Sequence, residues 1–178
     1  MSKITVENVS YVYSPKTPFE MKALQNVSVN IESNRITGII GHTGSGKSTL
    51  VQMFNGITKP TEGRILLDGN DIWEHPKEIG KVRFKVGLVM QYPEYQLFEE
   101  TVRADRVIVL NDGRILYDGK PEEVFRHKKE LRAVGLDLPQ CASLCRRLED
   151  RGITLSGNVN TPEGAAKAIL ELINNKNK

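Results

Sequence analysis

The sequence of 178 residues lacks the features of several large protein classes. It has no apolar run near the roughly 18 residues that a membrane-spanning helix needs. Its beginning, MSKITVENVS, has no apolar segment typical of a secretory signal. The formal net charge of +3 is too small to predict nucleic-acid binding. We therefore expect one cytoplasmic domain with no nucleic acid among its partners.

The sequence contains few cysteines, namely Cys141 and Cys145. Their spacing of four places them on one helix face with Leu138, Leu144 and Leu148. We interpret both cysteines as reduced core residues. A metal site would need further ligands nearby, and the surrounding sequence offers none.

Strand-like and helix-like segments alternate through the chain, which predicts an α/β fold. Strands are expected at residues 3–13, 27–31, 35–40, 64–67 and 86–90, and a hairpin, VIVL-NDG-RILYDG, at 107–119. Helices are expected at 47–55, from Pro121, and twice in the tail, where Thr161 precedes Pro162, with a helical turn at 75–80. The segment RITGII at 35–40 is nearly all apolar, so we expect a strand that is buried on both faces.

One segment, GHTGSGKS, fits the phosphate-loop pattern G-x-x-x-x-G-K-[ST]. Its residues are Gly41, His42, Thr43, Gly44, Ser45, Gly46, Lys47 and Ser48. The glycines allow backbone N–H groups to surround a phosphate without side-chain clashes, and the following helix adds the positive end of its dipole. Lys47 is expected to reach the β- and γ-phosphates, and the Ser48 hydroxyl is expected to bind Mg²⁺. We therefore predict a site for a nucleotide phosphate.

A phosphate loop alone leaves transport ATPases, nucleotide kinases and GTPases open. Three further stretches narrow the choice: NVSYVYS, which contains Tyr13; VGLVMQ, which ends at Gln91; and ADRVIVLNDGRILYDGKPEEVF, which begins at Ala104. With these stretches, the sequence resembles the ATP-binding cassette (ABC) family. QYPEYQLFEETV is similar, more specifically, to the ATPase subunits of energy-coupling factor (ECF) transporters, the cobalt- and vitamin-importing group. The resemblance covers nearly the whole chain.

The resemblance implies that ATP is bound and that Tyr13 stacks on its adenine ring. Tyr11 faces the same side of an ideal strand, so periodicity alone does not choose between the two tyrosines. A tyrosine on an edge strand can also simply pack against the core.

The resemblance also implies the contacts to phosphate and Mg²⁺. Lys47, Ser48 and Thr49 match the family's phosphate and Mg²⁺ contacts. Gln91 matches the residue that approaches Mg²⁺ and the attacking water and that senses the membrane partner. Ser48 and Gln91 are therefore the expected metal contacts.

The implied fold is a truncated P-loop NTPase fold of the RecA-like, ABC ATPase type, with an N-terminal antiparallel β subdomain and a helical C-terminal tail. Residues 1–102 would form the N-terminal part of the ATPase domain, residues 103–125 a core hairpin, and residues 126–178 the tail. The implied partners are a second ECF-type ATPase in a heterodimer, a transmembrane coupling subunit and a substrate-binding membrane subunit. The chain would lie at the cytoplasmic face of the cell membrane as a peripheral protein.

The residues that catalyse hydrolysis in this family are absent from the sequence. The family's Walker B strand ends in Asp-Glu, which hold Mg²⁺ and polarise water; an LSGGQ signature and a switch histidine complete its site. The nearest Walker B shapes, residues 65–68 and 107–112, both run into glycine, so we interpret them as strand–turn junctions. The LSG at 155–157 lacks the rest of the signature, and no histidine (His42, His75 or His127) lies shortly before ADRV. We predict no catalytic residue in this chain.

All of these motifs belong to one contiguous block of the family pattern, which is missing between Val102 and Arg103. The segment LFEETVRADRVIVL is therefore interpreted as a deletion scar. The loss would take a neighbour from the strand at 35–40 unless another segment replaces it. Two functions stay open: an ATP-hydrolysing subunit of an ECF importer for vitamins or metal ions, and a non-catalytic nucleotide-binding fragment from an internally deleted or misassembled gene.

Overall fold

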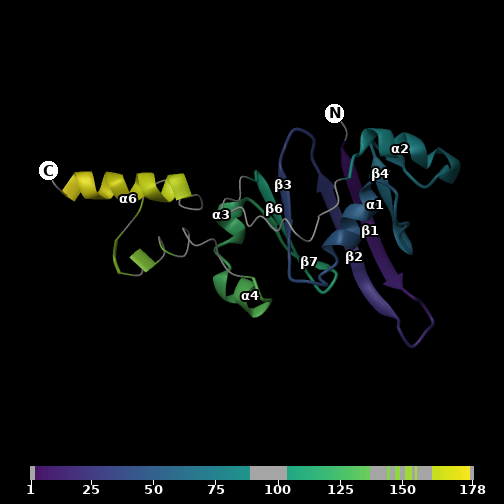
Figure 1. Cartoon of the computed structure of the whole chain (residues 1–178), viewed down its shortest axis with the longest axis horizontal. Helices are drawn as coiled ribbons and strands as arrows, with labels where there is room; N and C mark the ends of the chain where they lie inside the picture. The colour runs from purple at the N-terminus through teal and green to yellow at the C-terminus, as the bar shows by residue number, and fades with distance from the viewer. Residues whose placement is uncertain are drawn as a thin grey trace, which may run out of the picture.

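The described part of the protein contains two sheets, the helices beside them and a separate C-terminal helix (Figure 1). The computed structural model describes residues 3–88, 104–136, 144, 147–148, 151–153, 155 and 162–176. The C-terminal helix α6 (Pro162–Lys176) lies at the end of the molecule opposite the first sheet. The phosphate-loop residues all lie within the described ranges, whereas Val102, Arg103 and Gln91 lie outside them.

Sheet A is antiparallel and has the strand order β2-β1-β4-β5. Its strands are β1 (Ile4–Tyr13), β2 (Met21–Ile31), β4 (Glu62–Leu67) and β5 (Asn70–Asp71). Val6 pairs with Val29 on one side and with Ile65 on the other, and all three side chains are buried. The expected N-terminal antiparallel subdomain is therefore confirmed.

Sheet B is mixed and has the strand order β3-β6-β7. Its strands are β3 (Thr37–Ile40), β6 (Arg106–Asn111) and β7 (Arg114–Gly119). β6 and β7 form the expected hairpin, and β3 runs parallel to β6. The parallel pairing brings residues from both sides of the interpreted junction into one sheet.

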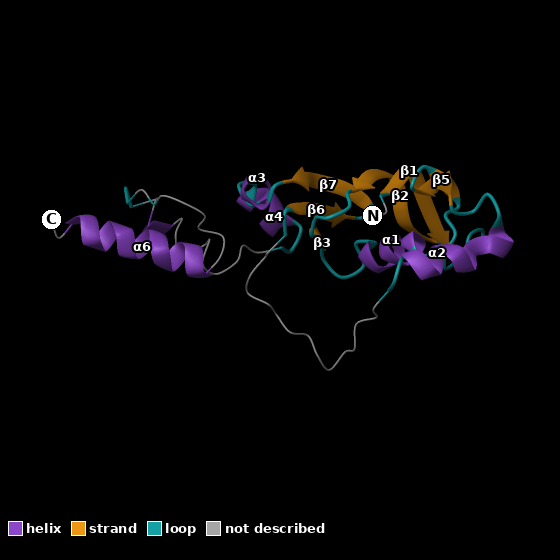
Figure 2. Cartoon of the chain, turned by 90° about the horizontal axis from the view of Figure 1, so that it is seen from above, coloured by secondary structure: helices purple, strands orange, loops and turns teal. Residues whose placement is uncertain are grey.

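The helices cover the sheets in two groups (Figure 2). They are α1 (Lys47–Phe54), the short 3₁₀ helix η1 (Pro76–Glu78), α2 (Ile79–Lys85), α3 (Pro121–Val124) and α4 (Lys128–Ala133). α1 and α2 lie on one side of sheet A, and α3 and α4 lie beside sheet B. None of the helices in the described ranges is long and apolar enough to cross a membrane.

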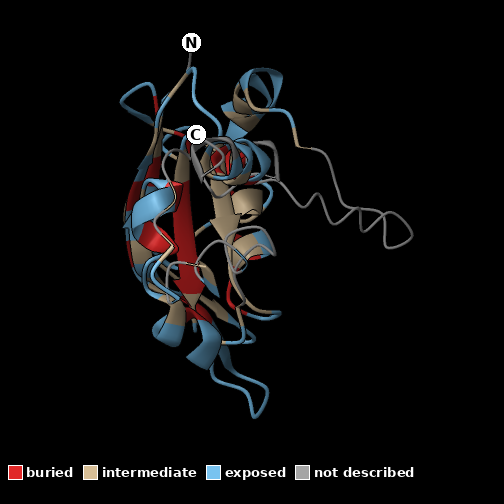
Figure 3. Ribbon diagram, turned by 90° about the vertical axis from the view of Figure 1, so that its left-hand side faces the viewer, coloured by how far each residue is buried: buried red, intermediate tan, exposed pale blue. Residues whose placement is uncertain are grey.

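Strand β6 lies between two hydrophobic clusters. Ile108 and Leu110 belong to the main cluster with sheet A and α1, whereas Val107 and Val109 belong to a second cluster with residues of α3 and α4. All four side chains are fully buried. Figure 3 shows in red where buried segments lie in the molecule. Burial of each such side chain stabilises the fold by roughly 1.5–3 kcal/mol. β6 therefore fixes the position of the strand beside it, β3, and of the loop that follows β3.

The expectation that the strand at 35–40 is buried on both faces is wrong. Every residue of β3 is only half-buried, and the preceding Ile36 is 64% exposed. The physical reason is that β6 is the only partner of β3 among the described strands. The other edge of β3 therefore has no described strand to cover its side chains.

Several element boundaries also differ from the expected ones. The second strand begins at Met21 rather than residue 27, because its first half pairs with the end of β1. Residues 86–88 are not a strand, and the rest of the expected strand at 86–90 lies outside the described residues.

The tail is helical, as expected, in the part that the structure describes. Helix α6 begins at Pro162, one residue after the predicted N-cap Thr161, which lies outside the described residues. Ala165 and Ala168 are the buried residues of this helix, and Ile173, expected on the same face, is 48% exposed. Cys141 and Cys145 lie outside the described residues.

Candidate nucleotide-binding site

The predicted phosphate loop lies at the carboxyl end of β3. β3 ends at Ile40 and α1 begins at Lys47, so the loop of residues 41–46 joins a parallel strand to a helix. Ligands of α/β proteins bind at this end of parallel strands. Because β6 runs parallel to β3, the turn that follows β6 reaches the same edge of the sheet.

Two glycines allow the loop to approach its neighbours closely. Gly46 has a φ angle of 100°, and a Cβ atom there would lie 2.5 Å from the carbonyl oxygen of Ala23. A Cβ atom at Gly41 would overlap the carbonyl oxygen of Leu110 and the hydroxyl of Ser45. The observed path of the loop therefore requires glycine at both positions.

The side chain of Lys47 folds back across the loop. Its ammonium group donates to the carbonyl oxygen of Gly41 at 2.7 Å and to that of His42 at 2.8 Å. Partial burial lowers the pKa of Lys47 below its usual value, because the charged form loses hydration. A positive charge therefore lies at the loop itself, where phosphate oxygens would be stronger acceptors than these carbonyl groups.

Backbone N–H groups of the loop are also available for a ligand. Within the described residues, the N–H groups of Gly44, Gly46 and Lys47 have no hydrogen-bond acceptor. The last two lie at the N-terminus of α1, where the helix dipole favours an anion. The loop therefore combines free N–H groups, a helix N-terminus and a lysine, which together suit a phosphate.

The two hydroxyl residues that follow Lys47 have different surroundings. Ser48 is exposed, and its hydroxyl has no hydrogen-bond partner among the described residues, so its oxygen is accessible to a metal ion. Thr49 is buried, and its hydroxyl lies 3.1 Å from that of Tyr13. The geometry suits Ser48 as a Mg²⁺ ligand, whereas the Thr49 hydroxyl is buried against Tyr13.

The structure separates the two tyrosines that strand periodicity left equivalent. Tyr13 is 36% exposed, and its contact with Thr49 places it beside the start of α1. Tyr11 packs against the main hydrophobic cluster and contacts the Tyr13 ring edge-on, with ring centroids 4.8 Å apart. Tyr13 is therefore the tyrosine with a ring surface available next to the phosphate loop.

The His42 side chain contacts one residue of the loop and one residue outside it. Its Nδ1 lies 2.7 Å from the carbonyl oxygen of Thr43, which can only accept, so Nδ1 carries the proton. Its Nε2 lies 3.6 Å from a carboxylate oxygen of Asp112, in the turn between β6 and β7. This side chain therefore links the loop to the β6–β7 turn.

Sequence patterns did not predict that the β6–β7 turn supports the loop. The N–H of Gly113 donates to the carbonyl oxygen of Ser45 at 3.1 Å, and Ser45 is fully buried. The Asn-Asp-Gly sequence predicts the turn itself. Its contact with a loop some 70 residues earlier depends on the parallel pairing of β3 with β6, which has no local sequence signal.

The remaining predicted residues do not form a catalytic centre within the described ranges. Residues 65–68 end β4 and begin the turn to β5, and residues 107–112 belong to β6 and its turn, as expected for strand–turn junctions. His75 is exposed, and His127 stacks on Tyr117 with ring centroids 4.2 Å apart. Gln91, predicted to contact Mg²⁺, lies outside the described residues, as do residues 156 and 157 of the LSG stretch.

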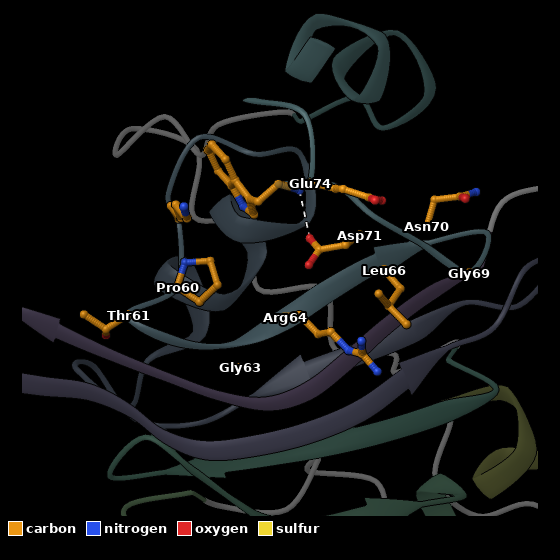
Figure 4. Close-up of a pocket in the computed structure, with 11 residues that line it drawn as sticks. Pro60, Thr61, Gly63, Arg64, Leu66, Gly69, Asn70, Asp71 and Glu74 are labelled. Atoms are coloured by element: carbon orange, nitrogen blue, oxygen red, sulfur yellow. Dashed lines mark hydrogen bonds between the residues drawn. The ribbon is translucent and has the colours of Figure 1, made fainter. Parts of the chain in front are cut away.

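A pocket of about 550 Å³ lies at the β4–β5 edge of sheet A, away from the phosphate loop (Figure 4). Its charged side chains have both signs, with Arg64 and Lys59 set against Asp71 and Glu74. Arg64 is already paired with Glu7 at 2.6 Å. No phosphate-loop residue lines this pocket, so it is not part of the candidate site.

Comparison with known proteins identifies relatives along most of the chain. Residues 24–170 match the family model described as ABC transporter. The energy-coupling factor transporter ATP-binding protein EcfA2 of Clostridium perfringens is 30% identical over 283 residues, covering 98% of this chain and 99% of the relative. EcfA2 of Clostridium acetobutylicum is 48% identical over 134 residues, which make up 75% of this chain and 46% of the relative.

The lengths of these alignments show a difference in length between this chain and its relatives. The 283 aligned positions exceed the 178 residues of this chain by 105, so at least that many positions of the Clostridium perfringens protein have no counterpart here. The matched segment of the Clostridium acetobutylicum protein is less than half of its length. The chain is therefore much shorter than the relatives it matches.

Solved structures confirm the expected P-loop fold. The structure of cbiO1 from Clostridium perfringens, part of the ABC transporter complex cbiONQ, has a TM-score of 0.60 at 24% identity and covers 80% of this chain and 98% of that one. A bacterial ABC transporter cassette solved as a dimer has a TM-score of 0.52 at 18% identity and covers 66% of this chain.

Proposed function

We propose that this chain, which belongs to the ABC transporter family, is the ATP-binding subunit of an energy-coupling factor transporter. The family binds ATP, normally with Mg²⁺, and the two relatives described above are named energy-coupling factor transporter ATP-binding proteins. When bound, Mg²⁺ would offset the negative charge of the phosphates.

The observation that carries this proposal is the phosphate loop with its own lysine folded onto it. Lys47 donates to two loop carbonyl groups, and three nearby N–H groups have no described acceptor. In the proposed complex, Lys47 and these N–H groups hold the β- and γ-phosphates. Ser48 and Gln91 contact Mg²⁺, and Tyr13 stacks on adenine.

Hydrolysis by the isolated chain is expected to be close to background. Catalysis of phosphoryl transfer depends on groups that stabilise charge at the γ-phosphate and position the attacking water. The sequence contains no Walker B Asp-Glu pair, no complete signature and no switch histidine in the expected place. We therefore propose binding of MgATP without appreciable turnover.

In a transporter, the proposed partners are a second ATPase subunit, a transmembrane coupling subunit and a substrate-binding membrane subunit. The chain would act at the cytoplasmic face of the membrane, and the transported substrate would be a vitamin or a metal ion. The partner ATPase could supply its signature to the shared site. The Walker B residues of this chain would still be missing from that site.

The second candidate function is a non-catalytic nucleotide-binding fragment from an internally deleted or misassembled gene. The absence of at least 105 positions relative to the Clostridium perfringens protein supports it. Sequencing the DNA across codons 95–110, together with intact mass of the protein from its native cells, tests whether the short chain is a natural product.

Binding and turnover can be measured separately on the purified chain. Titration calorimetry with MgATP is expected to show binding, and Lys47→Ala is expected to weaken it by about 100-fold or more, because a charged phosphate contact is lost. Lys85→Ala, a surface lysine paired with Asp68 at 3.6 Å, is the matched control and should bind as the unmodified chain does.

Phosphate release is the second measurement. The unmodified chain and Lys47→Ala are expected to release phosphate at the same background rate. Steady turnover that Lys47→Ala abolishes would contradict the proposed loss of catalysis. Absence of MgATP binding by the unmodified chain would contradict the proposed function as a whole.

A further inference from the structure

Three segments meet beneath the phosphate loop. The carbonyl oxygen of Ala23, in β2, lies 2.5 Å from where a Cβ atom of Gly46 would stand and 2.6 Å from where a Cβ atom of Gly113 would stand. A glycine of the loop and a glycine of the β6–β7 turn therefore pack against the same carbonyl group. The loop, β2 and the turn form one close-packed junction, which we call the loop base.

Main-chain hydrogen bonds connect the three segments of the loop base. Gly113 donates its N–H to the carbonyl oxygen of Ser45 at 3.1 Å, and its own carbonyl oxygen accepts the N–H of Gln25 at 2.8 Å. Ser45 is fully buried, so its carbonyl group cannot easily replace this donor with water. The position of the turn therefore determines the position of Ser45 in the loop.

The side chain of Gln25 fixes the turn in this position. Its Nε2 donates to the carbonyl oxygen of Asp112 at 3.0 Å, and its Oε1 accepts from Nη2 of Arg114 at 3.0 Å. With its main-chain N–H, this one residue makes hydrogen bonds to three consecutive residues of the turn and β7. Within the described residues, none of its hydrogen bonds goes to the loop itself.

We propose that Gln25 is a positioning residue that sets the affinity of the phosphate loop by holding the β6–β7 turn against Ser45. This role rests on the proposed nucleotide binding. The free N–H groups of the loop bind phosphate only if they converge, and their directions follow from the path of the loop through Ser45 and Gly46. Loss of the Gln25 side chain leaves the fold intact but lets the turn, and with it the loop, shift.

The expected effect is moderate because the main-chain hydrogen bonds remain. The Gln25 side chain makes one neutral hydrogen bond, to the Asp112 carbonyl, and one charge-assisted hydrogen bond, from the Arg114 guanidinium. Removal of both at a partly exposed residue should weaken MgATP binding about threefold to tenfold. Mg²⁺-pyrophosphate, which has no adenine and can engage only the phosphate site, should lose affinity by the same factor. Equal losses would place the effect at the loop rather than at Tyr13.

The test compares two variants of Gln25 with a matched control. Gln25→Ala removes the side chain, and Gln25→Met keeps its length but not its hydrogen bonds. Asn70→Ala is the control, because its amide also donates to a turn carbonyl, that of Asp68 at 3.3 Å, in sheet A away from the loop. Affinities are measured by calorimetry at a temperature where circular dichroism shows every variant to be folded.

We expect both Gln25 variants to bind MgATP and pyrophosphate more weakly and Asn70→Ala to bind as the unmodified chain does. Unchanged affinity in Gln25→Met, or unchanged affinity with a lowered unfolding temperature in Gln25→Ala, would overturn the positioning role while leaving the proposed function in place. Failure of the unmodified chain to bind MgATP would overturn both.

Discussion

Two tight turns in this protein have almost the same backbone conformation but different surroundings. Asp68 and Gly69, between β4 and β5, have φ angles of 55° and 84°, and Asp112 and Gly113, between β6 and β7, have φ angles of 47° and 73°. No atom lies within 4 Å of a Cβ atom built on Gly69. A Cβ atom built on Gly113 would lie 2.6 Å from the Ala23 carbonyl oxygen.

The difference teaches that an Asp-Gly turn can have only a local role or can support a distant site. In sheet A, the Asp68 carboxylate accepts the N–H of Lys3 at 2.9 Å, which ties the turn to the start of β1. In sheet B, the Asp112 carboxylate faces His42 of the phosphate loop, and Gly113 donates to Ser45. The first turn therefore closes its own sheet, whereas the second reaches the candidate site.

The largest contrast is expected from the same substitution at both glycines. Gly69→Ala should lower the free energy of unfolding by about 1–2 kcal/mol, the cost of a left-handed backbone conformation for alanine. Gly113→Ala carries that cost and an overlap with main-chain atoms of β2, so a loss of about 3 kcal/mol or more is expected. Urea unfolding of both variants measures the difference, and equal losses would show that the loop base tolerates a side chain.

A smaller contrast in stability is expected at the two aspartates, and here the turn in sheet A should be the more sensitive one. Asp68→Ala should lower the free energy of unfolding by about 1 kcal/mol through the lost hydrogen bond from Lys3 and should leave MgATP affinity unchanged. Both alanine variants share the cost of a left-handed backbone conformation. Beyond that cost, Asp112→Ala should change stability by less than about 0.5 kcal/mol, because its side-chain contacts lie at the surface. Urea unfolding and calorimetry on the same samples test this, and a loss of MgATP affinity in Asp68→Ala would contradict the separation of the two turns.

The smallest expected effect is proton uptake by Lys47 of the phosphate loop when MgATP binds. Lys47 has a pKa lowered by burial, and a bound phosphate would stabilise its charged form and raise that pKa. MgATP binding should therefore take up a fraction of a proton as the pH rises toward the ordinary lysine value of 10.5. Calorimetry in alkaline buffers of different ionisation enthalpy measures this uptake. Lys47→Arg, which stays protonated, should show none, and uptake of the same size in that variant would contradict the assignment to Lys47.

The sequence predicted those parts of the protein that depend on local patterns. The Gly41–Ser48 motif lies between a strand and a helix as expected, because its glycines and apolar flanks determine the local path. The Asn-Asp-Gly turn also lies where its residues predict it.

The parts that local patterns could not predict depend on contacts between distant segments. The half-burial of β3 was not predicted, because an apolar sequence does not show which neighbours its strand will have. Strand periodicity left Tyr11 and Tyr13 equivalent. The position of Tyr13 beside α1 depends on its contact with Thr49, a residue 36 positions later in the chain. Gln25 carries no motif, and only the pairing of β3 with β6 brings the β6–β7 turn close to it.

The support of the loop by the β6–β7 turn has a consequence for synthesis on the ribosome. Gly113 is translated 67 residues after Gly46. At the usual elongation rates, the supporting turn is therefore synthesised roughly 3 to 13 seconds after the loop. Until that turn has left the ribosome, the Ser45 carbonyl group lacks its Gly113 donor and the loop base is incomplete.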